Sequence, residues 1–220
     1  MPPFVKNVKH LEDHASLLAR QLEARKIGLD RPMETLDRKY LTLAEVQKLV
    51  HGARLMRNGD RNAFMLLFMF RHALRASEVC NLRWSHIDPY TRTVWIQRAK
   101  GGKSVAHTLE LDEIYEFTQL PQFNEYVFNC ERKKPFSTRG LYKLVETAGK
   151  KAKLNFKVHP HMLRHAKGYH LANNNVPLLT IKEYMGHKSV KSTTIYTEIA
   201  ASQYAGLGKD NLEVTTGGLD

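Results

Sequence analysis

The chain has 220 residues and carries 34 Lys and Arg against 22 Asp and Glu, a formal net charge of +12. This length can bury the core of one domain with a small appendage, and the excess positive charge favours a polyanionic partner. Two cysteines without CxxC spacing argue against a disulfide framework and a zinc site. A reducing cytoplasm is therefore expected, and the amino terminus lacks the apolar stretch of a signal peptide.

The first predicted elements are helical. Residues 10–27 have helical composition but a mixed apolar face, and the segment up to Lys39 is charged, which predicts an N-terminal helical arm or linker over 1–39. Thr42 followed by Glu45 has the pattern of a capping box and predicts a helix to about Met56. The next predicted helix begins at Asn58-Gly59-Asp60.

That second helix carries the apolar run 63–70, which is too short to span a bilayer and therefore indicates a buried helix. It is expected to continue to Leu74, and Ser77 is expected to cap a short helix after it. Cys80 follows Val79 and is interpreted as a small core residue.

The pattern changes to strands between Trp84 and Leu111. A break at 88–91 precedes the strand 93–96, and alternating residues from 105 to 111 form a second strand. The turn Lys100-Gly101-Gly102-Lys103 joins them, so Lys100 is expected at the tip of a β-hairpin. Further helices are predicted over 112–119, 137–152, 160–174, 177–185 and 190–198, with Ser137 and Ser189 as caps. The predicted fold class is mainly α with a small antiparallel β-sheet.

The positive charge is concentrated in one stretch of the chain. Between Glu131 and Lys191, 14 Lys and Arg stand against three acidic residues. Scattered lysines usually form a solvated surface, but here they surround His161, Arg164 and His187. This concentration is typical of a nucleic-acid-binding surface.

The candidate site is a tyrosine preceded by five cationic or ionisable side chains: Arg75, Lys100, His161, Arg164, His187 and Tyr196. The negative charge of a phosphodiester becomes more concentrated in its pentavalent transition state, so its cleavage requires fixed donors and cations. Guanidinium groups suit this task, since each can bond two oxygens and stays protonated. The set predicts a site that binds and breaks a phosphodiester.

These residues resemble the catalytic domain of the tyrosine site-specific recombinases. The resemblance rests on Ala73-Leu74-Arg75-Ala76-Ser77-Glu78-Val79, the hairpin lysine, His161-Met162-Leu163-Arg164-His165, and Met185-Gly186-His187 nine residues before Tyr196. It covers roughly residues 40 to 200. Within the family the chain looks most like the small fimbrial phase-variation DNA invertases, because it is short and contains His159-Pro160-His161.

The resemblance implies a role for each residue. Tyr196 would attack the scissile phosphate and form a 3′-phosphotyrosine, so no ATP would be needed for resealing. Arg75 and Arg164 would hold the non-bridging oxygens, and Lys100 would protonate the 5′-oxygen without a metal or other cofactor. His161 and His187 would bond the phosphate or move the tyrosine proton, in an order that the residues leave open. Glu78 would orient one of the cationic side chains from behind.

Each residue also has a simpler interpretation. Tyr184 and Tyr204 compete with Tyr196 as nucleophile, and the spacing from His187 favours Tyr196. Arg75 could merely pair with Glu78 on a helix surface. Lys103 competes with Lys100, and His161 with His165 has the four-residue spacing of a zinc pair, although no HExxH motif is present.

The expected partner is double-stranded DNA with paired recombination sites. The resemblance implies a homotetramer on DNA, a monomer or weak oligomer when free, accessory DNA-bending proteins and no membrane. It divides the chain into the arm 1–39, a catalytic domain over 40–200, and a segment 201–220 that is either exchanged between protomers or folded back on its own domain. Two alternatives are a type IB topoisomerase-like enzyme and a DNA-binding regulator without catalysis.

Overall fold

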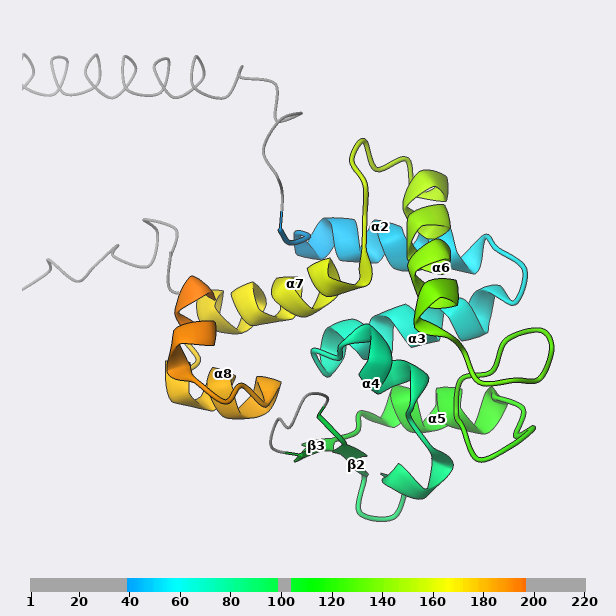
Figure 1. Ribbon diagram of the computed structural model, residues 1–220, viewed down its shortest axis with the longest axis horizontal. Coiled ribbons are helices and arrows are strands. Elements are labelled where there is room, and N and C mark those ends of the chain that lie inside the picture. The colour runs from blue at the N-terminus through cyan, green and yellow to red at the C-terminus, as the bar shows by residue number, and fades with distance from the viewer. Residues whose placement is uncertain (1–38, 99–103, 197–220) are drawn as a thin grey trace, which may run out of the picture. The chain divides into compact units, whose positions relative to one another are not determined.

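The computed structural model describes residues 39–98 and 104–196, all within the compact unit Arg38–Asp220. Its helices are α2 (Leu43–Arg54), α3 (Gly59–Arg71), α4 (Ala76–Cys80), α5 (Leu111–Gln119), α6 (Thr138–Lys151), α7 (Pro160–Asn173) and α8 (Leu178–Met185). The strands β1 (Ile87–Asp88), β2 (Thr93–Ile96) and β3 (Val105–Thr108) form one antiparallel sheet in that order (Figure 1). The predicted fold class, mainly α with a small antiparallel sheet, is confirmed. No helix in the described ranges is long and apolar enough to cross a membrane.

The first described helix begins where the sequence predicts. The Thr42 hydroxyl accepts a hydrogen bond from the Glu45 amide, and the Glu45 carboxylate accepts one from the Thr42 amide at 2.8 Å. These two amides at the helix start are thereby satisfied, and such a cap stabilises a helix by about 1 kcal/mol. α2 then packs against both α3 and α6 (Figure 1).

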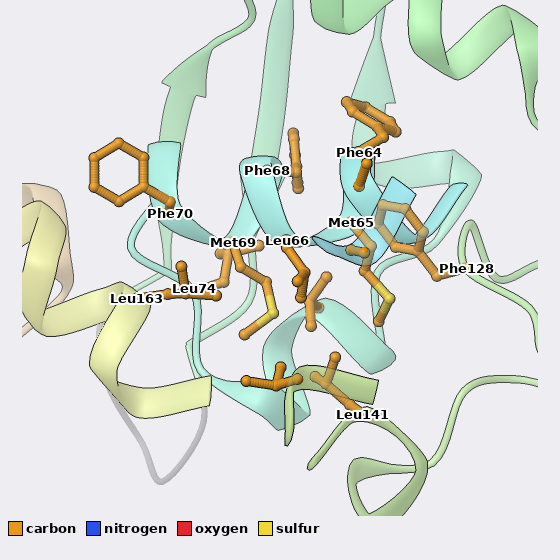
Figure 2. Close-up of a cluster of buried hydrophobic side chains, with 14 of the residues drawn as sticks. Phe64, Met65, Leu66, Phe68, Met69, Phe70, Leu74, Phe128, Leu141 and Leu163 are labelled. Carbon is orange, nitrogen blue, oxygen red and sulfur yellow. The ribbon is translucent and has the colours of Figure 1, made fainter. Parts of the chain in front are cut away.

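The core is built around α3, as the apolar run predicts. Phe64, Met65, Leu66, Phe68 and Met69 are all buried. Figure 2 shows these side chains gathered with Phe128, Leu141 and Leu163 from other parts of the unit. Burial of each such side chain contributes about 1.5–3 kcal/mol relative to leaving it in water, so α3 is the rigid centre on which the other elements pack.

The end of α3 differs from the prediction. The helix stops at Arg71 and does not reach Leu74, because Ala73 adopts a left-handed conformation with φ of 51°. The Leu74 amide bonds back to the Met69 carbonyl at 2.9 Å, which closes the turn. Left-handed backbone is costly for a residue with a side chain, and here the Ala73 carbonyl accepts hydrogen bonds from the side chains of Arg164 and Arg98.

The start of α4 also differs. Ser77 was expected as its cap, but Arg75 holds the N-cap position. The Glu78 carboxylate, in the first turn of the helix, accepts a hydrogen bond from the Arg75 amide at 2.9 Å and so ties the helix start together from the other side. Cys80 is buried, as expected for a core residue, and burial raises the pKa of its thiol to about 12.

The hairpin pairs β2 with β3 as predicted, but its second strand ends at Thr108, before the predicted end at Leu111, where α5 begins. Thr93 pairs with Thr108 and Ile96 with Val105, while Asp88 accepts the amide hydrogens of Tyr90 and Thr91 in the preceding turn. The alternation continues past β2, so Arg98 falls on the buried face together with Val94 and Ile96. The hairpin tip, with Lys100 and Lys103, lies outside the described residues.

The later helices lie close to their predicted positions. The Ser137 hydroxyl caps α6 by accepting the Gly140 amide at 3.0 Å, and Pro160 occupies the first turn of α7. The last predicted helix, 190–198, is wrong within the described residues. Two 3₁₀ helices, η3 (Val190–Ser192) and η4 (Thr194–Tyr196), take its place, because the amides of Thr193 and Tyr196 bond three residues back.

Candidate active site

One pocket of about 420 Å³ brings together most of the predicted site residues. It lies among the turn before α4, the start of α7, the end of α8 and the two 3₁₀ helices. The residues that line it are Arg75, His161, Arg164, His165, Gly186, His187, Lys188, Ser192, Ile195 and Tyr196. Five of the six proposed catalytic residues therefore share one cavity, and the sixth, Lys100, lies outside the described residues.

Main-chain carbonyls hold the Arg164 guanidinium. Its side chain is 1% exposed, and it donates to the carbonyls of Ala73 and of Met185, the latter at 2.8 Å. The left-handed turn at Ala73 therefore supplies one of the acceptors. Burial, followed by repulsion from Arg75 and Arg98, lowers the pKa of Arg164 to about 9. An anion in the pocket would offset the repulsion among these cations, so the site favours anion binding.

The Glu78 carboxylate joins three arginines. Its Oε1 accepts from Arg75 at 2.7 Å, its Oε2 accepts from Arg98 at 2.9 Å, and Arg164 lies 3.9 Å away. Burial would raise the pKa of Glu78, but Arg98, the hydrogen bonds from Arg75 and the charge of Arg164 lower it overall. The carboxylate is thus a buried anion among cations. Arg75 does pair with Glu78, as its simpler interpretation expects, and it also lines the pocket.

Tyr196 is packed tightly against α7. It is 2% exposed, and its hydroxyl lies 3.1 Å from Nδ1 of His165. A Cβ at Gly168 would come within 2.5 Å of the tyrosine Cζ, so the ring occupies space that only glycine leaves open. Burial raises the pKa of Tyr196 to about 12, although Arg164 and Arg75 act in the opposite direction.

The pocket histidines are electrically neutral near pH 7. Burial, together with Arg164 and Arg75, lowers the pKa of His187 to about 4, and the same causes lower the pKa of His161. Burial and His161 lower the pKa of His165 to about 4. Nδ1 of His187 lies 2.9 Å from the Thr193 hydroxyl, which fixes the orientation of its ring. Neutral imidazoles can both donate and accept, so these side chains suit proton transfer.

The competing residues are placed differently. The Tyr184 hydroxyl donates to the Arg71 carbonyl at 2.6 Å, and its ring stacks on His107, outside the pocket lining. Tyr204 and Lys103 lie outside the described residues. The rings of His161 and His165 meet edge to face, with 4.6 Å between their centroids. Within 39–98 and 104–196, no group of three or more metal-ligand side chains is placed to hold an ion.

Sequence reasoning missed three contributors. His165 was considered only as a zinc partner, yet it contacts the tyrosine hydroxyl. Gly168 gave no signal, since an isolated glycine in a helix has many explanations. Arg98 could have been found, because the strand alternation places a charged side chain on the buried face of β2.

A helical domain with a three-stranded sheet and this pocket has the architecture of the tyrosine recombinases. A model of the phage integrase family matches residues 39–203, and the chain belongs to that family. Type 1 fimbriae regulatory protein FimB of Escherichia coli K12 is 34% identical over 178 residues, which cover 77% of this chain and 89% of FimB. FimE of the same strain is 32% identical over 183 residues, which cover 79% of this chain and 92% of FimE.

Solved structures agree with the fold. A crystal structure of XerA recombinase matches with a TM-score of 0.64 and 25% identity, covering 76% of this chain and 63% of XerA. XerH site-specific recombinase bound to its difH substrate matches with a TM-score of 0.66 and 22% identity, covering 80% of this chain and 55% of XerH. The chain therefore spans little more than half of each of these recombinases.

Proposed function

We propose that this protein is a site-specific DNA recombinase that cleaves and rejoins DNA through a 3′-phosphotyrosine on Tyr196. The observation that carries the proposal is the single pocket in which Arg75, His161, Arg164 and His187 surround the phenol. Membership of the phage integrase family supports the same reaction class. DNA inversion or integration is the expected outcome.

The two arginines form the phosphate clamp. Arg164 donates to two carbonyls, which use two of its five N–H donors, and Arg75 is anchored through Glu78. Both guanidiniums are thus held before the substrate arrives. Such fixed donors stabilise the pentavalent transition state without further reorganisation, which is the main electrostatic source of rate enhancement.

The chemical step exchanges one ester for another. The Tyr196 oxygen bonds to phosphorus, the bond from phosphorus to the 5′-oxygen breaks, and the 5′-oxygen leaves as a hydroxyl after gaining a proton. We assign His165 to accept the proton that the phenol loses, and His187 and His161 to donate hydrogen bonds to the phosphate oxygens. With Nδ1 of His187 facing the Thr193 hydroxyl, we assign the ring proton to Nε2.

Lys100 is proposed as the acid that protonates the 5′-oxygen. The strands β2 and β3 that flank its turn are paired up to Ile96 and Val105, so the hairpin provides an ordered base for it. A substrate with sulfur at the 5′-leaving position should restore cleavage by Lys100→Ala, because a thiolate leaves without a proton. Rescue of Lys103→Ala alone would assign the acid to Lys103.

The proposed partner is double-stranded DNA with paired sites, bound by four protomers, and accessory DNA-bending proteins are expected in addition. The solved relatives with this fold include recombinases bound to DNA, which supports DNA as the partner. The catalytic domain is proposed over 40–200, preceded by the arm 1–39. The segment 201–220 is proposed to dock on a neighbouring protomer. The free protein is expected to be a monomer or weak oligomer that acts on DNA in the cytoplasm.

The test begins with the DNA site. Duplexes bound by the purified protein are selected from a random pool and compared with inverted repeats beside the gene. A selected duplex is then nicked near the cleavage point, so that the short 5′-fragment diffuses away and the covalent complex accumulates. We expect an adduct at Tyr196 that forms in the presence of EDTA. Binding of selected duplexes without any adduct would instead identify a non-catalytic regulator.

A further inference from the structure

Arg98 is a buried arginine outside the lining of the pocket. Its side chain is 0% exposed, and it follows β2 on the buried face of the hairpin. It donates to Glu78 Oε2 at 2.9 Å, to the Tyr184 carbonyl at 2.6 Å and to the Ala73 carbonyl at 3.5 Å. It therefore contacts the turn before α4, the helix α4 and the end of α8 at once.

Stability alone is a poor explanation for this arginine. Removing a guanidinium from water is expensive, and buried ion pairs are often replaced by apolar side chains without loss of stability. The Nε of Arg98 also has no hydrogen-bond partner among the described residues, which adds to the cost. A buried cation kept at such a cost indicates a role in the site that it touches.

Arg98 contacts the same groups, or their neighbours, that hold the two arginines of the phosphate clamp in place. Glu78 anchors Arg75, the Ala73 carbonyl holds Arg164, and Tyr184 directly precedes the Met185 carbonyl that also holds Arg164. A Cβ at Gly186 would come within 2.7 Å of the Arg98 Cγ, so the turn that leads to His187 rests on the arginine stem.

We propose that Arg98 is a positioning residue of the phosphate clamp, which keeps Arg75 and Arg164 directed at the pocket. Arg164 lies 3.9 Å from the same Glu78 oxygen that Arg98 bonds at 2.9 Å. Because Arg98 already bonds that oxygen, Arg164 keeps its hydrogen bonds to the carbonyls of Ala73 and Met185. Without Arg98, the buried carboxylate would draw Arg164 towards itself and away from the phosphate.

The proposal rests on the proposed function, so the test has one arm that does not require DNA cleavage. In this arm, inorganic phosphate is titrated into the free protein, and the NMR signals of the arginine side chains report binding at the pocket. The variants are Arg98→Met, Arg98→Lys and the control Arg61→Met. Arg61 is a suitable control because it is partly buried and donates to the Asn129 carbonyl at 2.7 Å, outside the lining of this pocket.

The second arm measures single-turnover cleavage of a nicked, selected duplex. The scissile group is either an ordinary phosphate or a neutral methylphosphonate, which needs less cationic stabilisation. For Arg98→Met we expect cleavage of the phosphate to fall on the order of a hundredfold, as for other misplaced catalytic groups, while the loss on the methylphosphonate is much smaller. The cleavage rate of Arg98→Lys should fall between the rates of the wild type and Arg98→Met, since one ammonium cannot reproduce the fork that bonds Glu78 and the Tyr184 carbonyl.

Two results would overturn the role of Arg98. One is an Arg98→Met protein that binds phosphate and cleaves like the wild type. The other is an equal loss on both substrates, which would indicate general disruption. If Arg98→Met does not fold, Arg98→Lys takes its place, and its loss of rate on the phosphate is compared with its loss of rate on the methylphosphonate. A wild-type protein that forms no adduct with any selected duplex would contradict the proposed function, and the phosphate titration would then decide the role of Arg98 alone.

Discussion

At the scale of single residues, Tyr196 combines burial with a high pKa. Its hydroxyl is protonated near pH 7, since burial raises the pKa to about 12. The phenol must therefore lose its proton during the attack, and His165 is the side chain in hydrogen-bond contact with it. Arg164 and Arg75 stabilise the phenolate that forms, so the same cations serve the binding of the phosphate and the deprotonation of the tyrosine.

Replacing Tyr196 by phenylalanine should abolish the covalent adduct and leave DNA binding intact, because only the hydroxyl is lost. Thermal unfolding should change by no more than about 1 kcal/mol, the net value of one hydrogen bond. Tyr184→Phe is the matched control, since it also loses one buried hydrogen bond and should still form the adduct. An adduct trapped at Tyr184 or Tyr204 in the Tyr196→Phe protein would show that the nucleophile is misassigned.

Arg164→Lys should reduce cleavage by about 10²-fold or more, because an ammonium cannot bond two carbonyls and a phosphate in the fork geometry of a guanidinium. Arg75→Ala should lower the cleavage rate at least as much. The measurement is the single-turnover rate at saturating DNA. Arg83→Lys, in an exposed pair with Glu125, is the control for loss of a guanidinium elsewhere. A rate for Arg164→Lys close to wild type would show that the clamp does not depend on this residue.

The residue types and spacings could be predicted from sequence, and so could Glu78 as a supporting side chain, but the main-chain supports could not. Arg75, Arg164 and Tyr196 belong to motifs that are read from side chains alone. The partners of Arg164 are carbonyls, whose direction depends on the backbone conformation, and the sequence carries no side-chain signal for them. His165 was visible, but its partner could be identified only once α7 and η4 were placed together.

At the scale of elements, the packing of η4 on α7 depends on one glycine. Alanine at position 168 would ordinarily favour a helix by about 1 kcal/mol. Here its Cβ would come within 2.5 Å of the Tyr196 ring and displace it. The tyrosine is therefore positioned by the shape of the helix surface as well as by His165.

Gly168→Ala should thus lower the cleavage rate at least about tenfold, a modest share of what misplacing a reacting group can cost. DNA binding should persist, since no charged group is removed. Gly140→Ala on α6 is the control, because its nearest new contact is Ser137 Oγ at 3.1 Å, in another part of the unit. Wild-type cleavage by Gly168→Ala would mean that the ring moves away from α7 before it reacts.

The helices that carry clear caps were predicted well, and the irregular ends were not. Thr42 and Ser137 cap α2 and α6 as expected, because their side chains signal the start of a helix. Ala73 gave no such signal, since left-handed backbone is normally indicated by glycine or asparagine. The β-branched Thr193 and Thr194 disfavour a regular helix, and the Thr193 hydroxyl is engaged by His187, so tertiary contacts decided the 3₁₀ form.

At the scale of the whole molecule, a buried histidine network links the sheet to the helices. His107 on β3 lies 3.1 Å from His72 and 2.9 Å from the Tyr184 carbonyl, and His72 lies 3.2 Å from Glu113 on α5. Burial, followed by the charges of His72 and Arg98, lowers the pKa of His107 to about 3. The folded protein therefore resists protonation of His107, whereas the unfolded chain accepts it near pH 6.5.

This difference predicts acid sensitivity. The contribution of His107 to stability is complete above about pH 6.5 and is lost as the pH falls towards 3, by about 1.4 kcal/mol per pH unit. Urea unfolding between pH 7 and pH 4.5 measures the slope of the free energy of unfolding against pH. His107→Gln should reduce that slope by about this amount, with His51→Gln on α2 as the surface control. An unchanged slope would place the acid sensitivity elsewhere.

The attachment of the clamp to the backbone has a consequence for how the protein tolerates mutation. Arg164 and Arg98 are bonded to the carbonyls of Ala73, Tyr184 and Met185, and every amino acid supplies a carbonyl. Substitution at Ala73 and Met185 is therefore constrained by packing and by the shape of the turn, and chemical identity matters less there than at Tyr184, whose side chain has contacts of its own. Neutral drift can change these side chains while the acceptors persist. Alignments that score side-chain identity would then underestimate how much of the site two distant relatives share.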